Sequence, residues 1–387
     1  MIDGPKTPVA SSPEGSSGRL GAARRGPIDD RETPAPRAPR GALAAKVIAW
    51  QRQHGRHDLP WQGSRDPYRV WLSEIMLQQT QVSTVLGYYP RFLARFADVR
   101  ALAAAPLDDV LALWSGLGYY SRARHLHRCA QTVVAEHGGT FPRSAAALAE
   151  LPGIGRSTAA AIAAFCFAER TAILDGNVKR VLTRALGFGD DLAVATHERA
   201  LWQRAQALLP DDGIEAYSQG LMDLGATLCS LRRPQCAVCP LQRLCVAHRA
   251  GEPERYPVKT RRLKRTQRSN ALLWLSQDDR VWLVQRPPRG VWAGLWSPPL
   301  YAGLDELRTQ SADWPGHGEA LAPINHALTH FDWHLQPWRH RLPPRISAAR
   351  RVTLEAQLPA GRWFTTEQAL RLGLPAPVRK LLASARY

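Results

Sequence analysis

The pattern of apolar and polar positions changes twice along the chain. Residues 1–40 are rich in Pro, Gly, Ser and Arg with almost no apolar periodicity, which indicates a disordered tail. From about residue 41 to 255, Ala- and Leu-rich stretches alternate with short Gly/Pro breaks, which predicts a mainly helical domain. Within it, "TAAAIAAFCFA" (158–168) is apolar throughout and predicts a buried helix.

Beyond residue 269 the period shortens to that of strands. The stretch "ALLWLSQDDRVWLVQR" predicts two strands joined by a polar turn. "LTHFDWHLQPW" alternates, with Phe331, Trp333 and Leu335 on one face. We therefore expect the helical domain (41–255) to be followed by a smaller α+β domain (269–387).

The charge balance indicates a polyanionic partner. The chain carries 51 basic and 33 acidic residues, a formal net charge of +18. This excess favours nucleic acid, although a surplus that only aids solubility explains it about as well. The stretch "YPVKTRRLKRTQR" (256–268) holds six basic residues and no acid. A linker that lies along a phosphate backbone and a connector that is merely solvated explain this stretch equally well.

The chain lacks membrane and export signals. No apolar run approaches the ~20 residues needed to span a bilayer, and the first residues lack the apolar core of a signal peptide. We therefore expect a protein of the reducing cytoplasm, in which a disulfide framework is not expected.

Four cysteines lie in "CSLRRPQCAVCPLQRLC" (229–245), namely Cys229, Cys236, Cys239 and Cys245. Structural zinc sites generally use two separated pairs, whereas this run has a single C-x2-C with longer arms. Such runs hold iron–sulfur cubanes, so the spacing favours one 4Fe-4S cluster over zinc. The arms carry three arginines, and the default role of the metal is structural. The remaining Cys129 and Cys166 are expected in the core.

The stretch "SAAALAELPGIGRSTAAAIAAF" (144–165) predicts a helix, a tight turn and a second helix. Pro152, Gly153 and Gly155 break the first helix and allow close approach of the backbone to a partner. The second helix starts near Arg156–Ser157, so its free N–H groups form a phosphate site. A plain helix corner with a glycine C-cap is the alternative.

Two acids are candidate catalytic groups. Glu74 lies on the flank of a helix whose apolar face is Trp71, Leu72, Ile75 and Met76. Partial burial there would raise the pKa of its carboxyl and suit a general acid, while an ordinary exposed helical Glu is the alternative. The helix should end near Gln79, which leaves Gln79 in a turn from which it can insert into a partner.

Asp175 precedes the helix that begins in "LDGNVKRVL". An N-cap position favours its ionised form, and plain capping is a sufficient alternative explanation. Enzymes that cleave glycosidic bonds use two such acids, one that holds a proton and one that remains a carboxylate.

Together these motifs resemble the helix–hairpin–helix DNA glycosylases that carry an iron–sulfur cluster. "LPW", "WLSEIMLQQTQV", "LWSGLGYYSRAR", "LPGIGRSTAAAI", "ILDGNVKRVL" and "MDLGATLC" closely resemble the MutY-type adenine DNA glycosylases. The resemblance covers residues 41–255 and is extended by "QRPPRGVWAGLWSPP" and "HALTHF". It implies a helix–hairpin–helix glycosylase domain with a 4Fe-4S loop, followed by a Nudix-like domain.

The resemblance also implies a function and a set of roles. The enzyme would be a monofunctional, monomeric repair glycosylase of the bacterial cytoplasm, associated with the nucleoid. It would remove adenine paired with 8-oxoguanine or guanine in double-stranded DNA after flipping the adenine out. Glu74 would protonate adenine and Asp175 would stabilise the oxocarbenium-like sugar. Trp61 and Gln62 would line the pocket for adenine. Gln79, Leu117 and Tyr119 would act as wedges that enter the duplex.

In the Nudix-like domain the chain lacks an acidic Nudix helix, so hydrolysis of a free nucleotide is not expected. The oxidised-guanine reader of the family is a Phe-Ser-His turn, which here reads Leu328, Thr329 and His330. Thr329 keeps the hydroxyl and His330 is retained, but the aromatic ring is lost.

Two other functions are alternatives to a monofunctional adenine glycosylase. An endonuclease III-like glycosylase-lyase needs a lysine amine, which its relatives carry just after the hairpin glycines, where this chain has Ser157. Between residues 41 and 255 only Lys46 and Lys179 occur. A non-catalytic iron–sulfur DNA-binding protein or redox sensor explains the cysteines, hairpin and charge, but gives Glu74 no task.

Overall fold

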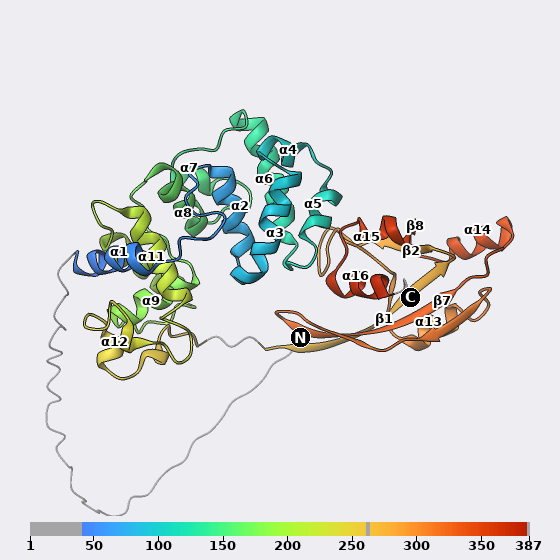
Figure 1. The fold of residues 1–387 in the computed structure, drawn as a ribbon. Coiled ribbons are helices and arrows are strands. Elements are labelled where there is room, and N and C mark those ends of the chain that lie inside the picture. The colour runs from blue at the N-terminus through green and yellow to red at the C-terminus, as the bar shows by residue number, and fades with distance from the viewer. Residues whose placement is uncertain (1–40, 261–263, 385–387) are drawn as a thin grey trace, which may run out of the picture. The chain divides into compact units, whose positions relative to one another are not determined.

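The computed structural model describes residues 41–260 and 264–384, so the predicted tail (1–40) lies outside the described residues. The first part of the chain is helical (Figure 1). Its elements are α1 (Ala42–His54), α2 (Pro67–Leu77), α3 (Val82–Arg95), α4 (Val99–Ala104), α5 (Leu107–Trp114), α6 (Ser121–His137), α7 (Ala145–Ala149), α8 (Arg156–Phe167), α9 (Gly176–Leu186), α10 (Ala195–Ala207), α11 (Ile214–Ala226), η1 (Cys236–Val238), α12 (Val246–Arg249) and η2 (Pro253–Arg255). In the described ranges, no helix is both long and apolar enough to cross a membrane.

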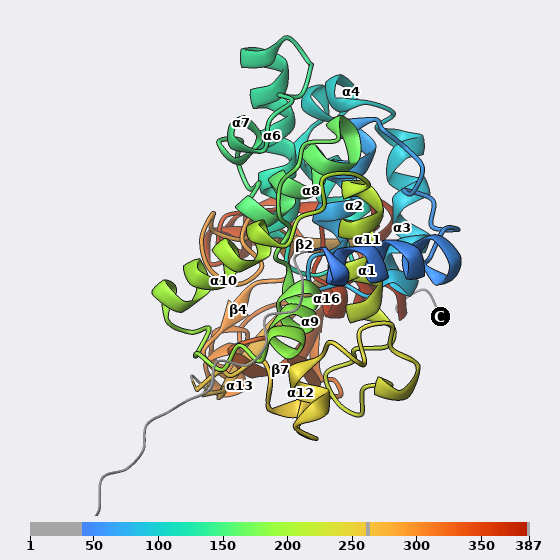
Figure 2. The ribbon, with the colours of Figure 1, turned by 90° about the vertical axis from the view of Figure 1, so that its left-hand side faces the viewer.

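Helix α8 lies between two apolar cores of the helical domain. Ala159, Ile162 and Ala163 belong to a core that includes side chains of α2 to α6. Ala160, Ala161 and Ala164 belong to a second core, with side chains of α1, α9, α10 and α11. Small alanine side chains allow close approach of other helices on both sides, and a helix that is apolar all round must be buried. The sequence prediction of a buried helix is therefore confirmed. Figure 2 shows α8 beside α2 and α11.

The second part of the chain forms a mixed sheet with short helices. Its elements are β1 (Thr266–Gln277), β2 (Arg280–Gln285), β3 (Trp296–Ser297), β4 (Leu300–Tyr301), α13 (Leu304–Gln310), β5 (His317–Ala320), β6 (Ile324–Ala327), β7 (Phe331–Arg341), α14 (Ala348–Ala356), β8 (Gly361–Thr365), α15 (Thr366–Leu370) and α16 (Ala376–Ala383). The strand order across the sheet is β3-β2-β1-β7-β5. In addition, β4 pairs with β1, β6 pairs with β7, and β8 pairs with β2. The predicted division into a helical domain and an α+β domain is confirmed.

The register of the central strands follows the sequence pattern. β1 and β7 are parallel, with Thr266 opposite Phe331, and the other pairs are antiparallel. Phe331, Trp333 and Leu335 are buried while the intervening residues are more exposed, as the alternation predicts. β1 begins at Thr266, inside the stretch expected to be linker, because residues 266–268 pair with the start of β7.

Hydrogen bonds connect the α5–α6 loop to the α15–α16 region. Ser115 Oγ and Tyr120 Oη donate to the carbonyl of Leu374, at 2.8 Å and 3.0 Å. Arg379 Nε donates to Ser115 Oγ at 2.9 Å, and its Nη atoms donate to the carbonyls of Leu370 and Leu372. The loop that precedes α6 is therefore fixed by polar contacts with the C-terminal residues.

The predicted hairpin is present between α7 and α8. Gly153 has a φ of 78°, a left-handed conformation, and a Cβ there would lie 2.5 Å from the Cβ of His125. Gly155 is the N-cap of α8, with an ordinary φ of −82°. The two glycines thus have different roles, because only Gly153 needs the absence of a side chain.

We expect Gly153→Ala to lower the free energy of unfolding by about 1–3 kcal/mol, the usual cost of a left-handed non-glycine residue. Gly155→Ala is the matched control, since a Cβ at Gly155 meets no atom within 4 Å. Denaturant titration of both variants measures the difference. Equal stabilities would contradict the steric role assigned to Gly153.

Candidate active site

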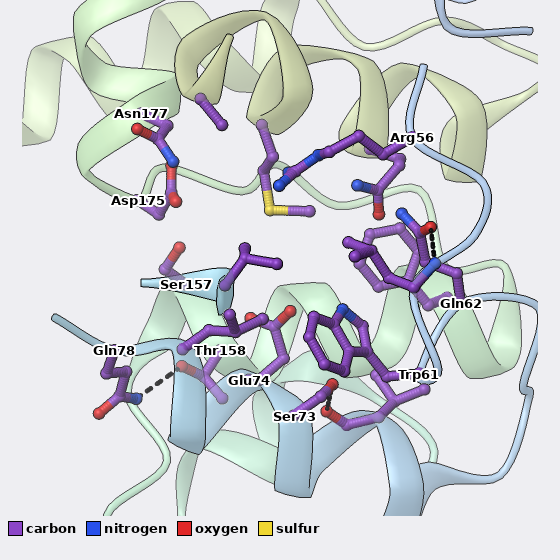
Figure 3. Close-up of a pocket in the computed structure, with 18 of the residues that line it drawn as sticks. Arg56, Trp61, Gln62, Ser73, Glu74, Gln78, Ser157, Thr158, Asp175 and Asn177 are labelled. Carbon is purple, nitrogen blue, oxygen red and sulfur yellow. Dashed lines mark hydrogen bonds between the residues drawn. The ribbon is translucent and has the colours of Figure 1, made fainter. Parts of the chain in front are cut away.

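A cavity of about 1120 Å³ opens in the helical domain, next to the buried helix α8. Its walls come from residues 56–65, the second half of α2 with the turn that follows it, the start of α8, the start of α9 and one face of α11. Of the residues singled out from the sequence, it contains Trp61, Gln62, Glu74, Gln79, Ser157 and Asp175. Figure 3 shows most of these side chains around the cavity.

Glu74 lies on α2, where the predicted apolar face is buried in the core. The helix begins with Pro67, after Asp66 accepts a hydrogen bond from the N–H of Tyr68. Its core face includes Trp71, Leu72, Ile75 and Met76, so Glu74 is left on the flank that faces the cavity. Burial, and secondarily the charge of Asp175, raises the pKa of Glu74 to about 8. The predicted raised pKa is therefore found.

Asp175 caps the N-terminus of α9, as the sequence predicts. Its Oδ1 accepts a hydrogen bond from the N–H of Val178 at 2.7 Å. The cap favours the ionised form of Asp175, as expected, but it is not the largest influence on its pKa. The cap hydrogen bonds do lower the pKa of Asp175, but burial raises it by more, so the net pKa lies above its usual value.

The cavity brings Glu74 and Asp175 together, although they are far apart in the sequence. The charge of Asp175 contributes to the raised pKa of Glu74, which requires the two carboxyls to be near each other. Figure 3 shows both side chains at the cavity, with Ser157 in the same region. Two carboxyl groups in different surroundings therefore line the same cavity. This arrangement is the one needed for acid catalysis next to a developing positive charge.

Trp61 and Gln62 form another part of the cavity wall. The Trp61 ring is buried and contacts the ring of Tyr89 edge-on, with centroids 5.5 Å apart. The Oε1 of Gln62 accepts a hydrogen bond from the N–H of Leu59, while its buried Nε2 has no hydrogen-bond partner among the described residues. A buried donor without a partner is unfavourable unless a ligand supplies an acceptor.

A polar cluster that sequence reasoning missed lies at the same cavity. The backbone N–H and Nε of Arg56 donate to the Asp223 carboxylate at 3.0 Å and 2.7 Å, and Gln219 Nε2 donates to it at 2.9 Å. Asp223 is fully buried, so these contacts fix Arg56 firmly. Arg56 and Asp223 are 167 residues apart, so local sequence carries no signal of the pair.

The predicted wedge residues divide into two groups. Gln79 and Tyr119 are exposed, and both have left-handed backbone conformations, with φ of 56° and 48°. The wedge role expected of Leu117 stays a prediction. Leu117 is 5% exposed and packs in the apolar core, because the chain reverses at Gly116 and Gly118, both of which have positive φ.

The hairpin residues lie beside the cavity. Ser157 Oγ accepts a hydrogen bond from the N–H of Leu174 at 3.2 Å and lines the cavity. Gly153 and Gly155 lie in the turn before α8 and do not line it. The hairpin therefore contributes residues of α8 to the cavity, namely Ser157, Thr158 and Phe165, and leaves its turn outside.

The four clustered cysteines follow α11 and surround η1. Burial raises the pKa values of Cys236, Cys239 and Cys245, and neighbouring thiols, Cys229 among them, raise them further, so the four thiols lie near one another. None of them is in a disulfide. In residues 41–260 and 264–384, no group of three or more His, Cys, Asp and Glu side chains is spaced to hold a single metal ion.

Helix α9 connects the cysteine loop to the cavity. Arg184 Nη1 donates to Cys229 Sγ at 3.3 Å and to the carbonyl of Ser230 at 2.7 Å. Arg180 Nε donates to the carbonyl of Cys229 at 2.7 Å. Asp175 caps the N-terminus of the same helix. The cysteine loop therefore helps to hold the helix that positions Asp175.

Thr329 and His330 lie in the exposed turn between β6 and β7 and do not line the cavity. The hydroxyls of Tyr119 and Thr329 are 3.1 Å apart, at hydrogen-bond distance. The structure therefore brings Thr329 next to Tyr119, one of the exposed residues that are predicted to act as wedges.

Two family models match the chain. One describes an HhH-GPD superfamily base excision DNA repair protein and matches residues 72–206, and the other describes a NUDIX domain and matches residues 270–384. A solved thermostable thymine-DNA glycosylase matches 54% of this chain and 95% of that chain, at 28% identity and a TM-score of 0.49.

Whole-chain relatives extend this match. The adenine DNA glycosylase of Buchnera aphidicola subsp. Acyrthosiphon pisum (strain APS) is 34% identical over 340 residues, which are 87% of this chain and 95% of that protein. The adenine DNA glycosylase of Homo sapiens is 32% identical over 88% of this chain and 73% of that protein. This chain therefore belongs to the adenine DNA glycosylase family, with an HhH-GPD domain followed by a NUDIX domain.

Proposed function

We propose that this protein hydrolyses the N-glycosidic bond of adenine mispaired with 8-oxoguanine or guanine in duplex DNA. The observation that carries the proposal is the pairing of Glu74, with a pKa of about 8, and Asp175 at one cavity. Relatives named adenine DNA glycosylase, which align over most of the chain, support the choice of adenine.

The chemistry follows from the unequal surroundings of the two acids. At neutral pH Glu74 holds a proton, which it can donate to a ring nitrogen of adenine and so make the base a better leaving group. The electrons of the N-glycosidic bond then move to the base, and the sugar becomes oxocarbenium-like. The carboxylate of Asp175 stabilises that positive charge. Glu74, now ionised, accepts a proton from the water that attacks the sugar.

The cavity walls suit an adenine that has left the base stack. A base inside a duplex cannot reach carboxyls in a cavity, so it must first flip out. Trp61 offers a buried apolar ring, and the unpaired Nε2 of Gln62 offers a donor for a ring nitrogen. The fixed guanidinium of Arg56 adds donors at the same wall.

The duplex is proposed to bind around the cavity mouth. The turn at Gly153 and Gly155 presents the N-terminus of α8, and the net charge of +18 favours a phosphate backbone. Gln79 and Tyr119 would enter the duplex as the adenine leaves. Thr329, beside Tyr119, and His330 would contact the base opposite the adenine.

We further propose that Cys229, Cys236, Cys239 and Cys245 hold one 4Fe-4S cluster. The donor set fits, because all four are free thiols near one another and a cubane takes one thiolate on each iron. When bound, the cluster supplies a crosslink for the loop rather than chemistry at the cavity. The loop carries Arg232 and Arg233, which are exposed and available to phosphates.

A strand-cleaving lyase is less well supported by the site. The position that carries lysine in the lyases is Ser157, which lines the cavity. Lys179 forms an ion pair with Glu198, and no lysine is among the residues that line the cavity in the described part of the chain. We therefore propose a monofunctional glycosylase.

Replacement of either acid tests the mechanism. With a duplex carrying adenine opposite 8-oxoguanine, we expect Glu74→Gln to lower the single-turnover rate of adenine release by about 10²–10⁴, the usual contribution of a general acid. Asp175→Asn should lower it by about 10²–10³, since a charge-stabilising group is lost. Base release is measured by gel after alkali treatment.

Glu215→Gln is the matched control, because Glu215 also lines the cavity but pairs with Arg65 at its exposed edge. It should retain near-normal activity. If Glu74→Gln is as active as the wild type, the proposed mechanism is wrong. Strand breaks without alkali treatment would instead favour the lyase.

The pH dependence of the same reaction follows from the raised pKa of Glu74. The carboxyl is protonated below pH of about 8 and loses its proton as pH rises through that value. We expect the single-turnover rate to fall about tenfold per pH unit above this point. The rate should also fall toward acid pH, as Asp175 takes up a proton. A rate that stays constant well above pH 8 in the bound complex would contradict the assignment of Glu74.

Removal of one proposed cluster ligand tests the structural role of the loop. Cys236→Ser should lose bound iron, unfold at lower temperature and bind duplex DNA more weakly, because the crosslink is broken. Cys166→Ser is the control, since Cys166 lies in α8 outside the loop. Iron content, thermal unfolding and DNA binding are measured together. A stable, tightly binding Cys236→Ser protein without iron would overturn the proposed role.

A further inference from the structure

Arg122 is a buried cation in the first turn of α6, only 8% exposed. A buried guanidinium generally pairs with a carboxylate, because leaving its charge without a partner is costly. Its hydrogen-bond partners in the described residues are instead six neutral oxygens, all in two turns of the chain. Both Nη atoms thus bond to neutral acceptors, whereas the buried Nε has no hydrogen-bond partner among the described residues.

The six hydrogen bonds link the end of α2 to the loop after α5. Arg122 Nη1 donates to the carbonyls of Ile75, Met76 and Gln78 at 2.7, 2.9 and 2.6 Å. Arg122 Nη2 donates to Thr80 Oγ1, Leu117 O and Gly118 O at 3.0, 3.2 and 3.3 Å. One planar group therefore fixes two separate turns relative to each other.

The positions of the acceptors explain why the charge is tolerated. Ile75 and Met76 lie in the last turn of α2, which ends at Leu77, and the carbonyl end of a helix carries partial negative charge. The Trp114 and Tyr119 rings lie 5.3 Å and 5.6 Å from the guanidinium carbon. Burial lowers the pKa of Arg122 to about 10, so the group remains charged at neutral pH.

Each of the two turns contains a left-handed residue. Gln79 and Tyr119, with φ of 56° and 48°, are exposed, and each directly follows a residue whose carbonyl accepts from Arg122, namely Gln78 and Gly118. A non-glycine residue in this region costs about 1–3 kcal/mol and persists only where its surroundings enforce it. The hydrogen bonds to residues on both sides of Gln79, and to the residue before Tyr119, supply that enforcement.

We propose that Arg122 is the positioning residue that holds Gln79 and Tyr119 at one separation, so that both side chains enter the duplex together. The proposal rests on the proposed function, because it assumes that these two residues replace a flipped adenine. Arg122 itself does not line the cavity and is almost fully buried. Its contribution belongs to the opening of the duplex and not to cleavage of the bond.

Arg122→Lys tests this separation of roles. Lysine keeps the charge, but its ammonium is a point donor that cannot span both turns. Single-turnover release of adenine is measured on two duplexes, one with adenine opposite 8-oxoguanine and one with adenine opposite an abasic-site analogue, where no base pair must be broken. We expect a loss of about tenfold on the first, in the range of one lost stacking contact, and less than about twofold on the second.

Two further variants keep the test sharp. Arg128→Lys is the matched control, an exposed arginine on the same helix, and should behave as the wild type on both duplexes. Thr80→Val removes one of the six acceptors with little risk to folding, and should give the same selective loss at about threefold. Thermal unfolding verifies that each variant is folded.

The outcomes separate this inference from the proposed function. If the wild type releases adenine from neither duplex, the proposed function fails and this inference fails with it. If the wild type is active but Arg122→Lys and Thr80→Val lose the same factor on both duplexes, or lose nothing, the proposed function stands and the positioning role is wrong.

Discussion

Burial of the middle of α8, residues 158–164, between two apolar cores is the constraint on which the rest of the helical domain depends. Alanines on opposite faces of this helix pack into two different cores, so α2 on one side and α9 and α11 on the other are fixed to the same central element. Glu74 comes from α2 and Asp175 from the start of α9. The cavity therefore owes its two acids to close packing around small side chains.

Local patterns predicted those parts of the site that depend on neighbouring residues. The flank position of Glu74, the end of its helix before Gln79, the cap at Asp175 and the alternation in β7 all follow from periods of 3.6 or 2. The direction of the pKa shift of Asp175 does not follow from the local sequence, because burial is set by the tertiary fold and here exceeds the effect of the cap.

Contacts between distant segments were beyond the sequence. Nothing near Arg56 indicates a partner 167 residues away, and nothing in "GYYSRAR" indicates that Arg122 bonds to the end of α2. Leu117 shows the same limit, because a loop leucine is equally compatible with an exposed wedge and a core position. Glycines that reverse the chain on both sides of it decide in favour of the core.

If the cavity binds adenine as proposed, the unpaired Nε2 of Gln62 bears on how it would reject other bases. A buried donor without an acceptor costs about 1–3 kcal/mol, so the empty pocket is less stable than a correctly filled one. A base that presents an acceptor there relieves this cost, whereas a base that presents a donor leaves two donors facing each other. Selection by unpaired polar groups is much stronger than selection by size alone. In the proposed function, Gln62 would therefore help to select the hydrogen-bonding edge of the base.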